Sequence, residues 1–148
     1  MRAPVRADVL FPFVSALDAY PAWMPLIHDV EALHGTHIDA PAWNVELRAR
    51  VGPFARSKRL RMERTQLITD RLAVFERRES DRSEHSTWRL VAEIAELADA
   101  DADLVELTMT MGYDGALWAG PILERVLDEQ VRAGRERLMA LVGSGPPG

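Results

Sequence analysis

Residues 121–142 read PILERVLDEQVRAGRERLMALV and form the longest segment of the chain with helical apolar spacing. Apolar side chains recur every three or four residues, which places them on one stripe of a helix: Leu123, Val126, Leu127, Val131, Leu138, Leu141 and Val142. Charged residues spaced i, i+4 occupy the other side, Pro121 suits a first helical turn, and Gly143 suits a helix end. The segment is therefore predicted to be an amphipathic helix, and its apolar stripe requires a partner surface.

The composition bounds what that partner can be. The chain has 148 residues, 47% hydrophobic and 28% charged, with a net charge of −5. We expect a single domain over residues 1–143 and a flexible tail at 144–148. The negative charge disfavours nonspecific binding to nucleic acid or anionic membranes, although a local basic patch could still exist. An uncharged apolar run near the ~18 residues of a membrane helix is lacking. The absence of cysteine excludes disulfides and thiolate chemistry and fits a reducing cytoplasm, the predicted location.

Short apolar segments broken by prolines occupy the first part of the chain. Val5, Ala7 and Val9 alternate with charged residues, which predicts a short strand, although Asp8 could instead cap a compact helix at 9–15. Asp18 can cap one more helical turn, which the prolines that follow cut short. Two short helices between a first and a second strand are therefore predicted.

The middle of the chain alternates apolar and polar residues in six segments: 29–33, 44–51, 56–66, 71–79, 85–97 and 104–113. Short turns join them, which predicts an antiparallel meander with one solvated face. The inner face is predicted to carry Leu47, Leu60, Met62, Phe75, Trp88, Leu90, Leu107, Met109, Met111 and Tyr113. The sequence thus predicts an α+β fold in which a curved antiparallel sheet of about six or seven strands packs on the long C-terminal helix.

Three short motifs carry a resemblance to a known group of proteins. They are Tyr20-Pro-Ala-Trp-Met-Pro25 after the first short helix, the strand end Val51-Gly-Pro-Phe54, and Trp88-Arg-Leu90 followed by the M-x-M-x-Y strand at 109–113. With this order of elements, the chain resembles the START/Bet v 1-like (SRPBCC) superfamily, and within it the bacterial polyketide cyclase/dehydrase and lipid-transport proteins. The resemblance covers nearly the whole chain.

The resemblance implies a helix-grip fold with a cavity between the sheet and the C-terminal helix, used by members for lipids, quinones, polyketides or other apolar molecules. It implies that Tyr20 and Trp23 lie at the cavity rim, although packing of the short helices is an alternative role. The candidate ligand-binding residues are Tyr20, Trp23, Leu47, Met62, Phe75, Arg77, Trp88, Leu90, Met109, Met111, Tyr113, Trp118, Leu127 and Val131. For each apolar member, plain core packing is the alternative interpretation.

Several residues of this region have two open interpretations. Arg77 shares the register of Phe75 and would point inward, where a ligand carboxylate, Glu76 or Glu79 could pair with it, unless its side chain reaches solvent. Trp118 could be a lid or an anchor before the long helix. Gly134 costs about 1 kcal/mol within a helix, so it either admits close packing or leaves room for a ligand.

Other chemistries find little support in the sequence. His34 and His37 lie in a loop without the partners of a zinc site, and Asp99, Asp101 and Asp103 lack the remaining positions of a calcium loop. Phosphate-cradling glycine loops are absent. We therefore predict neither a metal nor a cofactor. Arginines and one lysine gather at Arg48, Arg50, Arg56, Lys58, Arg59, Arg61 and Arg64. Cross-strand ion pairing on a solvated face is their predicted role, with RNA or ribosome contact as the alternative.

These observations favour a protein that binds a small hydrophobic molecule, for transport or sequestration, with neither a nucleic-acid partner nor integral membrane association. The alternative is an aromatase/cyclase-like enzyme, for which only Arg77, Tyr113 and His28 are candidate acid or base groups. A protein or ribosome interaction module is a third possibility. The oligomeric state and the ligand are not encoded in any motif of the sequence.

Overall fold

The computed structural model describes residues 1–35, 40–51, 53–79, 81, 85, 87–98, 103–113 and 121–144; for residues 49–51, 113, 121–128 and 130 it describes the backbone only. The elements in order are β1 (Arg2–Ala3), α1 (Ala7–Leu10), the 3-10 helices η1 (Phe11–Phe13) and η2 (Leu17–Ala22), β2 (Ile27–Leu33), β3 (Ala42–Val51), β4 (Phe54–Ile68), β5 (Leu72–Arg77), β6 (Trp88–Glu96), β7 (Val105–Tyr113) and α2 (Pro121–Ser144). No helix among these residues is long and apolar enough to cross a membrane.

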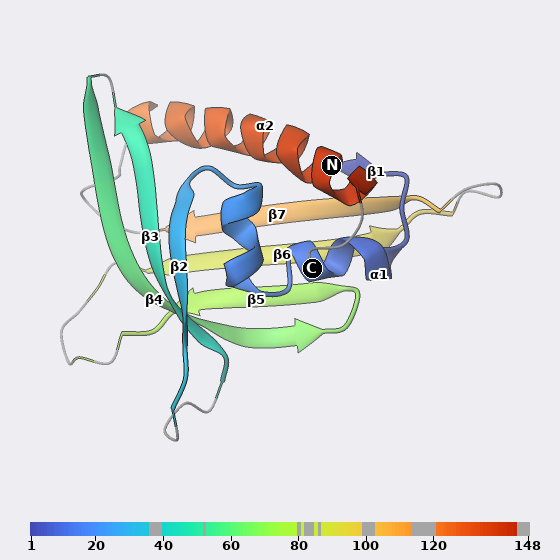
Figure 1. The fold of residues 1–148 in the computed structure, drawn as a ribbon, viewed down its shortest axis with the longest axis horizontal. Coiled ribbons are helices and arrows are strands. Elements are labelled where there is room, and N and C mark those ends of the chain that lie inside the picture. Colours follow the sequence, from blue (N-terminus) through green and yellow to red (C-terminus); the bar gives the residue numbers. More distant parts are fainter. Residues whose placement is uncertain are drawn as a thin grey trace.

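All seven strands form one antiparallel sheet in the order β1-β7-β6-β5-β4-β3-β2. The meander from β2 to β7 follows the chain, and β1 joins the far edge of β7. The 15-residue strand β4 contains a register shift between Arg64 and Gln66, and such a bulge bends a strand. Figure 1 shows the result: β4 runs through both halves of a strongly curved sheet, with β2 and β3 on one side and β5 to β7 on the other.

The helices lie on the concave side of this sheet (Figure 1). α2 spans the opening of the curve, and α1, η1 and η2 fill the space between α2 and strands β5 and β6. The core is continuous across the two layers, because Phe75 of β5 packs edge-on against Tyr20 of η2 and against Trp43 of β3. The predicted α+β architecture, a curved antiparallel sheet around a long C-terminal helix, is confirmed. The helix continues through Ser144, one residue into the predicted tail.

The prediction for the first strand was wrong. The strand is Arg2–Ala3; of the alternating residues, Ala7 and Val9 belong to α1, and Val5 lies in the bend before it. An alternation over five residues does not distinguish strand from helix. The two predicted caps were also wrong: Arg6 and Ala16 occupy the N-cap positions without a side-chain cap. Asp8 instead lies in the first turn of α1 and forms an ion pair with Arg6 at 3.0 Å.

Candidate ligand-binding site

A pocket of about 230 Å³ lies between α2, β7 and the segment that follows η2. Its lining is predominantly apolar and comes from four separate parts of the chain: Met1, Trp23, Met24, Leu107, Thr108, Met109, Val131, Gly134, Arg135 and Leu138. Leu138 and Leu107 are buried, whereas Val131 is 53% exposed. The pocket therefore has a closed apolar interior and an open side near Val131.

Two hydrogen bonds hold the wall formed by the segment after η2. The Trp23 indole donates from Nε1 to the carbonyl oxygen of Phe13 at 2.9 Å, and the Tyr20 hydroxyl donates to the carbonyl oxygen of Val14 at 2.9 Å. The two rings pack with centroids 4.8 Å apart. Because a buried aromatic with a satisfied polar tip is held in one orientation, Trp23 presents a fixed surface to the pocket.

Gly134 sets the approach of α2 to this wall. A Cβ at Gly134 would lie 3.2 Å from the carbonyl oxygen of Trp23 and 3.6 Å from Cε3 of its ring. The helix therefore rests directly on the Trp23–Met24 backbone. The structure shows close packing at Gly134, against the η2–β2 segment and not the sheet. Gly134 also lines the pocket, so the second interpretation, that it leaves room for a ligand, stays a prediction.

Thr108 and Arg135 supply the polar groups of the pocket. Arg135 is exposed on α2, and a guanidinium stays protonated at all physiological pH values. Thr108 lies on β7 beyond Val105 and Glu106, the residues that pair with β1. These groups can orient a ligand or bind an anionic end of it, but neither is a general base near neutral pH.

The structure distributes the predicted ligand-binding residues over several environments. Trp23, Met109 and Val131 line the pocket. Six others are buried core residues: Tyr20, Leu47, Met62, Phe75, Trp88 and Leu90. Met111 is half-buried and packs against the core. Trp118 and the side chains of Tyr113 and Leu127 lie outside the described residues. The roles of all these residues in binding a ligand stay predictions.

Arg77 is inward and paired. Its side chain is 9% exposed, and Nε donates to Oε1 of Glu79 at 2.8 Å, so one of the two predicted carboxylates is its partner. Nη2 lies 3.4 Å from Nδ1 of His85, whose Nε2 lies 2.6 Å from Oδ1 of Asp81. Burial lowers the pKa of the nearby Lys58, and the charge of Arg77 lowers it further. This polar cluster lies at the end of β5 and does not line the pocket.

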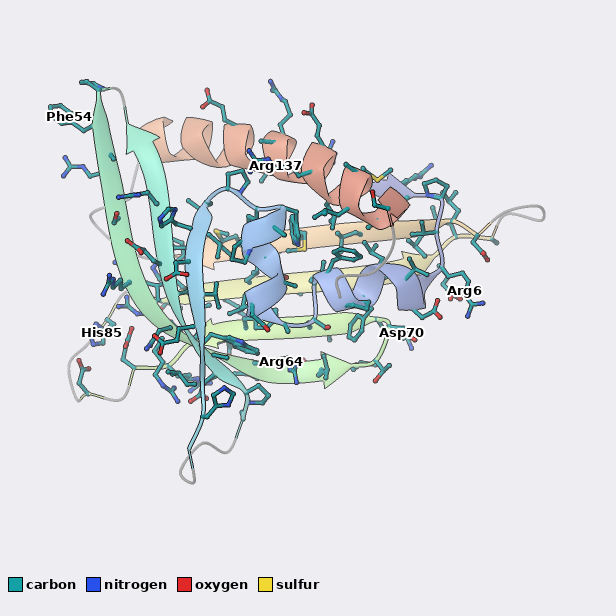
Figure 2. The ribbon with its side chains drawn as sticks, in the orientation of Figure 1. Arg6, Phe54, Arg64, Asp70, His85 and Arg137 are labelled. Carbon is teal, nitrogen blue, oxygen red and sulfur yellow. The ribbon has the colours of Figure 1, made fainter. Side chains whose placement is uncertain are left out.

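The arginine-rich region is only partly ion-paired. Arg61 forms a 2.6 Å ion pair with Glu63, which lies in the same strand, so this pair is not the predicted cross-strand contact. For Arg64 the prediction of a solvated ion pair was wrong. Its Nη1 donates to the carbonyl oxygen of Ser15 at 2.7 Å, and its guanidinium lies 5.9 Å from the centroid of the Trp43 ring. Figure 2 shows Arg64 beside the short helices of the concave side.

The histidines of the described chain do not form a catalytic or metal constellation. His28 is exposed on β2 and lies 3.4 Å from Nη1 of Arg48. His34 is exposed, and His37 lies outside the described residues, as do Asp99 and Asp101. Among the residues that the structure describes, no group of three histidines and carboxylates could hold a metal ion.

Sequence reasoning missed four of the lining residues: Met1, Met24, Thr108 and Arg135. The alternation of β7 assigns Thr108 to the outer face, but the pocket lies where the edge of β7 meets α2, so that a residue of either face can reach it. Met24 follows Trp23 directly, and its side chain is included only because α2 rests on this segment. The periodicity of a single element does not predict the position at which that element crosses another.

Comparisons with known proteins agree with this architecture. Residues 3–138 match the family described as "Polyketide cyclase / dehydrase and lipid transport". The Zhui aromatase/cyclase of Streptomyces sp. R1128 is similar in structure, with a TM-score of 0.62 and 14% identity over 97% of this chain and 90% of that one. Protein CV1439 of Chromobacterium violaceum has a TM-score of 0.59 and 15% identity over 96% and 95% of the two chains. Ara h 8.0201 has a TM-score of 0.57 and 12% identity over 97% and 94%.

At these identities the structural likenesses show the fold alone. A search of curated proteins found no match. The family match covers most of the chain, and together with the structures it confirms the resemblance inferred from the three short motifs.

Proposed function

The chain belongs to the polyketide cyclase/dehydrase and lipid transport family, and we propose that it binds a small hydrophobic molecule between α2 and β7, as a carrier or a store for it. The observation that carries this proposal is the apolar pocket of about 230 Å³. Ligand pockets for drug-sized molecules measure roughly 300–1,000 Å³, so the occupant is a compact molecule or the end of a longer one.

The lining explains how such a molecule would be held. Burial of apolar surface is worth about 25 cal/mol per Å², and the methionines at 24 and 109 provide flexible contacts that adapt to different shapes. Thr108 and Arg135 supply polar contacts that can fix the direction of the ligand. A lipid-like or polyketide-like molecule with one polar end fits this arrangement.

The alternative is an aromatase/cyclase-like enzyme, the activity named for the similar structure from Streptomyces. It needs a proton donor or acceptor within reach of the substrate. Of the predicted candidates, Arg77 is paired with Glu79 away from the pocket, His28 is exposed on β2, and the side chain of Tyr113 lies outside the described residues. Because the described lining offers only an arginine as a titratable side chain, we favour binding over catalysis.

A pocket-filling substitution tests the proposal. Val131→Trp places an indole at the open side of the pocket, and because Val131 is 53% exposed the fold can accommodate it. Ala140→Trp is the matched control: Ala140 is exposed, and nine residues along the helix turn it about 180° away from Val131. We expect Val131→Trp to weaken binding of anilinonaphthalene sulfonate at least about tenfold and Ala140→Trp to leave it unchanged.

Native mass spectrometry and solvent extraction of the purified protein provide the second measurement. An apolar molecule should co-purify with the original protein and with the Ala140→Trp variant, and it should be depleted in preparations of Val131→Trp. Equal probe binding by all three proteins, together with no extractable passenger, would contradict a ligand site at this position.

A further inference from the structure

The tip of the β3–β4 hairpin exposes a large aromatic side chain. Phe54 is 65% exposed, the highest exposure among the large hydrophobic residues that the structure describes. It is the first residue of β4 and pairs with Val51, the last residue of β3. Figure 2 shows its ring at the outermost point of the hairpin, pointing away from the molecule. A phenylalanine held out in water by a rigid hairpin makes no contribution to the core.

Positive charges surround this tip. Between Glu46 and Glu63 the sequence contains no acidic residue and six cations: Arg48, Arg50, Arg56, Lys58, Arg59 and Arg61. Only Arg61 pairs with a carboxylate in the described structure. The chain as a whole carries −5, so the segment 47–62 is locally basic in a chain that is acidic overall. Acidic residues, among them Asp29, Glu31 and Glu46, share a groove with Arg59 and Arg61 farther from the tip.

The register distributes the cations over both faces of the hairpin. Arg56 lies opposite Ala49 and Lys58 opposite Leu47, which are the positions of the concave face. Arg48 alternates with these positions and therefore belongs to the convex face. The tip thus has an exposed phenylalanine at the first position of β4, with Arg56 two residues behind it on the same strand and Arg48 on the facing strand.

We propose that this hairpin tip docks on the surface of an anionic lipid bilayer. Phe54 enters the boundary between headgroups and acyl chains, and the cations behind it contact lipid phosphates. The apolar tip would reach the depth of the acyl chains while the cations behind it stay at the depth of the headgroup phosphates, so the hairpin matches the two layers of a bilayer surface. A single-stranded nucleic acid is usually held by several aromatic side chains on which successive bases stack, whereas this tip exposes one aromatic ring, Phe54. The contact is peripheral, and it involves none of the residues that line the pocket.

The lack of native cysteine allows a direct test. Phe54→Cys, labelled with an environment-sensitive nitrobenzoxadiazole group, reports whether the tip leaves water. Ile68→Cys is the matched control, because Ile68 is 44% exposed and ends β4 at the opposite hairpin. We expect the label at position 54 to brighten and shift to the blue with vesicles of equal parts phosphatidylcholine and phosphatidylglycerol, and to respond little to phosphatidylcholine alone. The label at position 68 should respond to neither.

Vesicle sedimentation measures the contributions of the two kinds of group. Phe54→Ala should weaken binding at least about fivefold by loss of the inserted ring, and Arg56→Gln by about fivefold, the contribution of one cation at an anionic surface. Ile68→Ala and Arg71→Gln are controls at the other hairpin and should change nothing. Binding should fall as salt rises. Equal responses at positions 54 and 68, or a response to single-stranded RNA and none to vesicles, would overturn the proposal.

Discussion

Gly134 is the residue through which the C-terminal helix meets the N-terminal third of the chain. Its missing side chain lets α2 lie on the Trp23 carbonyl oxygen, which a Cβ would approach to 3.2 Å. We predict that Gly134→Leu destabilises the fold by about 2–3 kcal/mol, because the added side chain forces α2 away from this segment. Gly143→Leu on the same helix is the control, since nothing lies within 4 Å of its Cβ position.

The control should leave the free energy of unfolding in urea unchanged or raise it by up to about 1 kcal/mol, the difference in helix propensity. If both leucine variants are equally stable, α2 does not pack on the Trp23–Met24 backbone and the pocket wall assigned here is incorrect.

Tyr20 couples stability to alkaline pH. Burial raises the pKa of its phenol above the ordinary value of about 10. The stability that the neutral phenol provides is fully present below pH ~10, where the unfolded chain also holds the proton, and is lost as pH rises further. We expect the unfolding free energy of the original protein to fall more steeply above pH ~10 than that of Tyr20→Phe.

Above pH ~10 the slopes of unfolding free energy against pH for the two proteins should differ by up to about 1.4 kcal/mol per pH unit, the value for one proton released on unfolding. Below pH ~9 the two pH curves should run parallel, with Tyr20→Phe about 1–2 kcal/mol less stable than the original protein, because the substitution leaves the Val14 carbonyl oxygen without its donor. Urea titrations at a series of pH values measure both effects. Curves that stay parallel at alkaline pH would show that Tyr20 ionises as easily in the folded state as in the unfolded one.

At the scale of elements, Arg64 connects β4 to the short helices. The connection does not use a carboxylate. Nη1 donates a hydrogen bond to the Ser15 carbonyl oxygen at 2.7 Å, and the guanidinium faces the Trp43 ring. We predict that Arg64→Met costs about 1–2 kcal/mol, through loss of a charged hydrogen bond and of the cation–π contact. Arg64→Lys should recover little of it, because an ammonium does not reproduce the planar fork.

Arg56→Met on the same face of β4 is the matched control, because Arg56 is exposed near the tip and its loss should change stability by less than about 0.5 kcal/mol. Thermal or urea unfolding distinguishes the two positions. An Arg64→Met variant as stable as Arg56→Met would mean that η1 and η2 are held without this connection.

The strands were predictable because an antiparallel sheet with one solvated face has apolar and polar residues in alternation along each strand. Leu60 and Met62 of β4 and Trp88 and Leu90 of β6 are buried as their alternation predicts. The same rule failed near the N-terminus, where the true strand β1 is two residues long and leaves no pattern. It also misjudged Arg64, because the side chain on an inward register position found polar partners in the short helices, which alternation does not encode.

The candidate site was predictable only in part for a related reason. Trp23, Met109 and Val131 were selected from a motif and two periodicities, and they line the pocket. Thr108 and Arg135 depend on where α2 crosses the edge of β7. That crossing depends on the packing of α2 at Gly134 against the Trp23–Met24 segment, so it is a property of the packed elements and not of any one segment.

At the scale of the whole molecule, the pocket joins parts of the chain that are far apart in sequence. Its lining includes residue 1, residues 23 and 24, the stretch 107–109 on β7 and positions 131–138 on α2. A ligand that contacts all four parts is bound by the folded state and not by the unfolded chain. Binding must therefore raise the stability of the domain as a unit.

We predict that a ligand present at about 100 times its Kd raises the unfolding free energy by about 2.7 kcal/mol and the Tm by roughly 5–10 °C. Differential scanning calorimetry with the extracted passenger, or with anilinonaphthalene sulfonate, measures the shift. At the same ligand concentration, Val131→Trp should reduce the shift to about half or less, as a Kd weakened at least about tenfold requires, and Ala140→Trp should preserve it, because only the first substitution occupies the open side of the pocket. A shift of unchanged size in Val131→Trp would place the ligand elsewhere on the molecule, because a ligand of this pocket has to compete with the introduced indole for the same space.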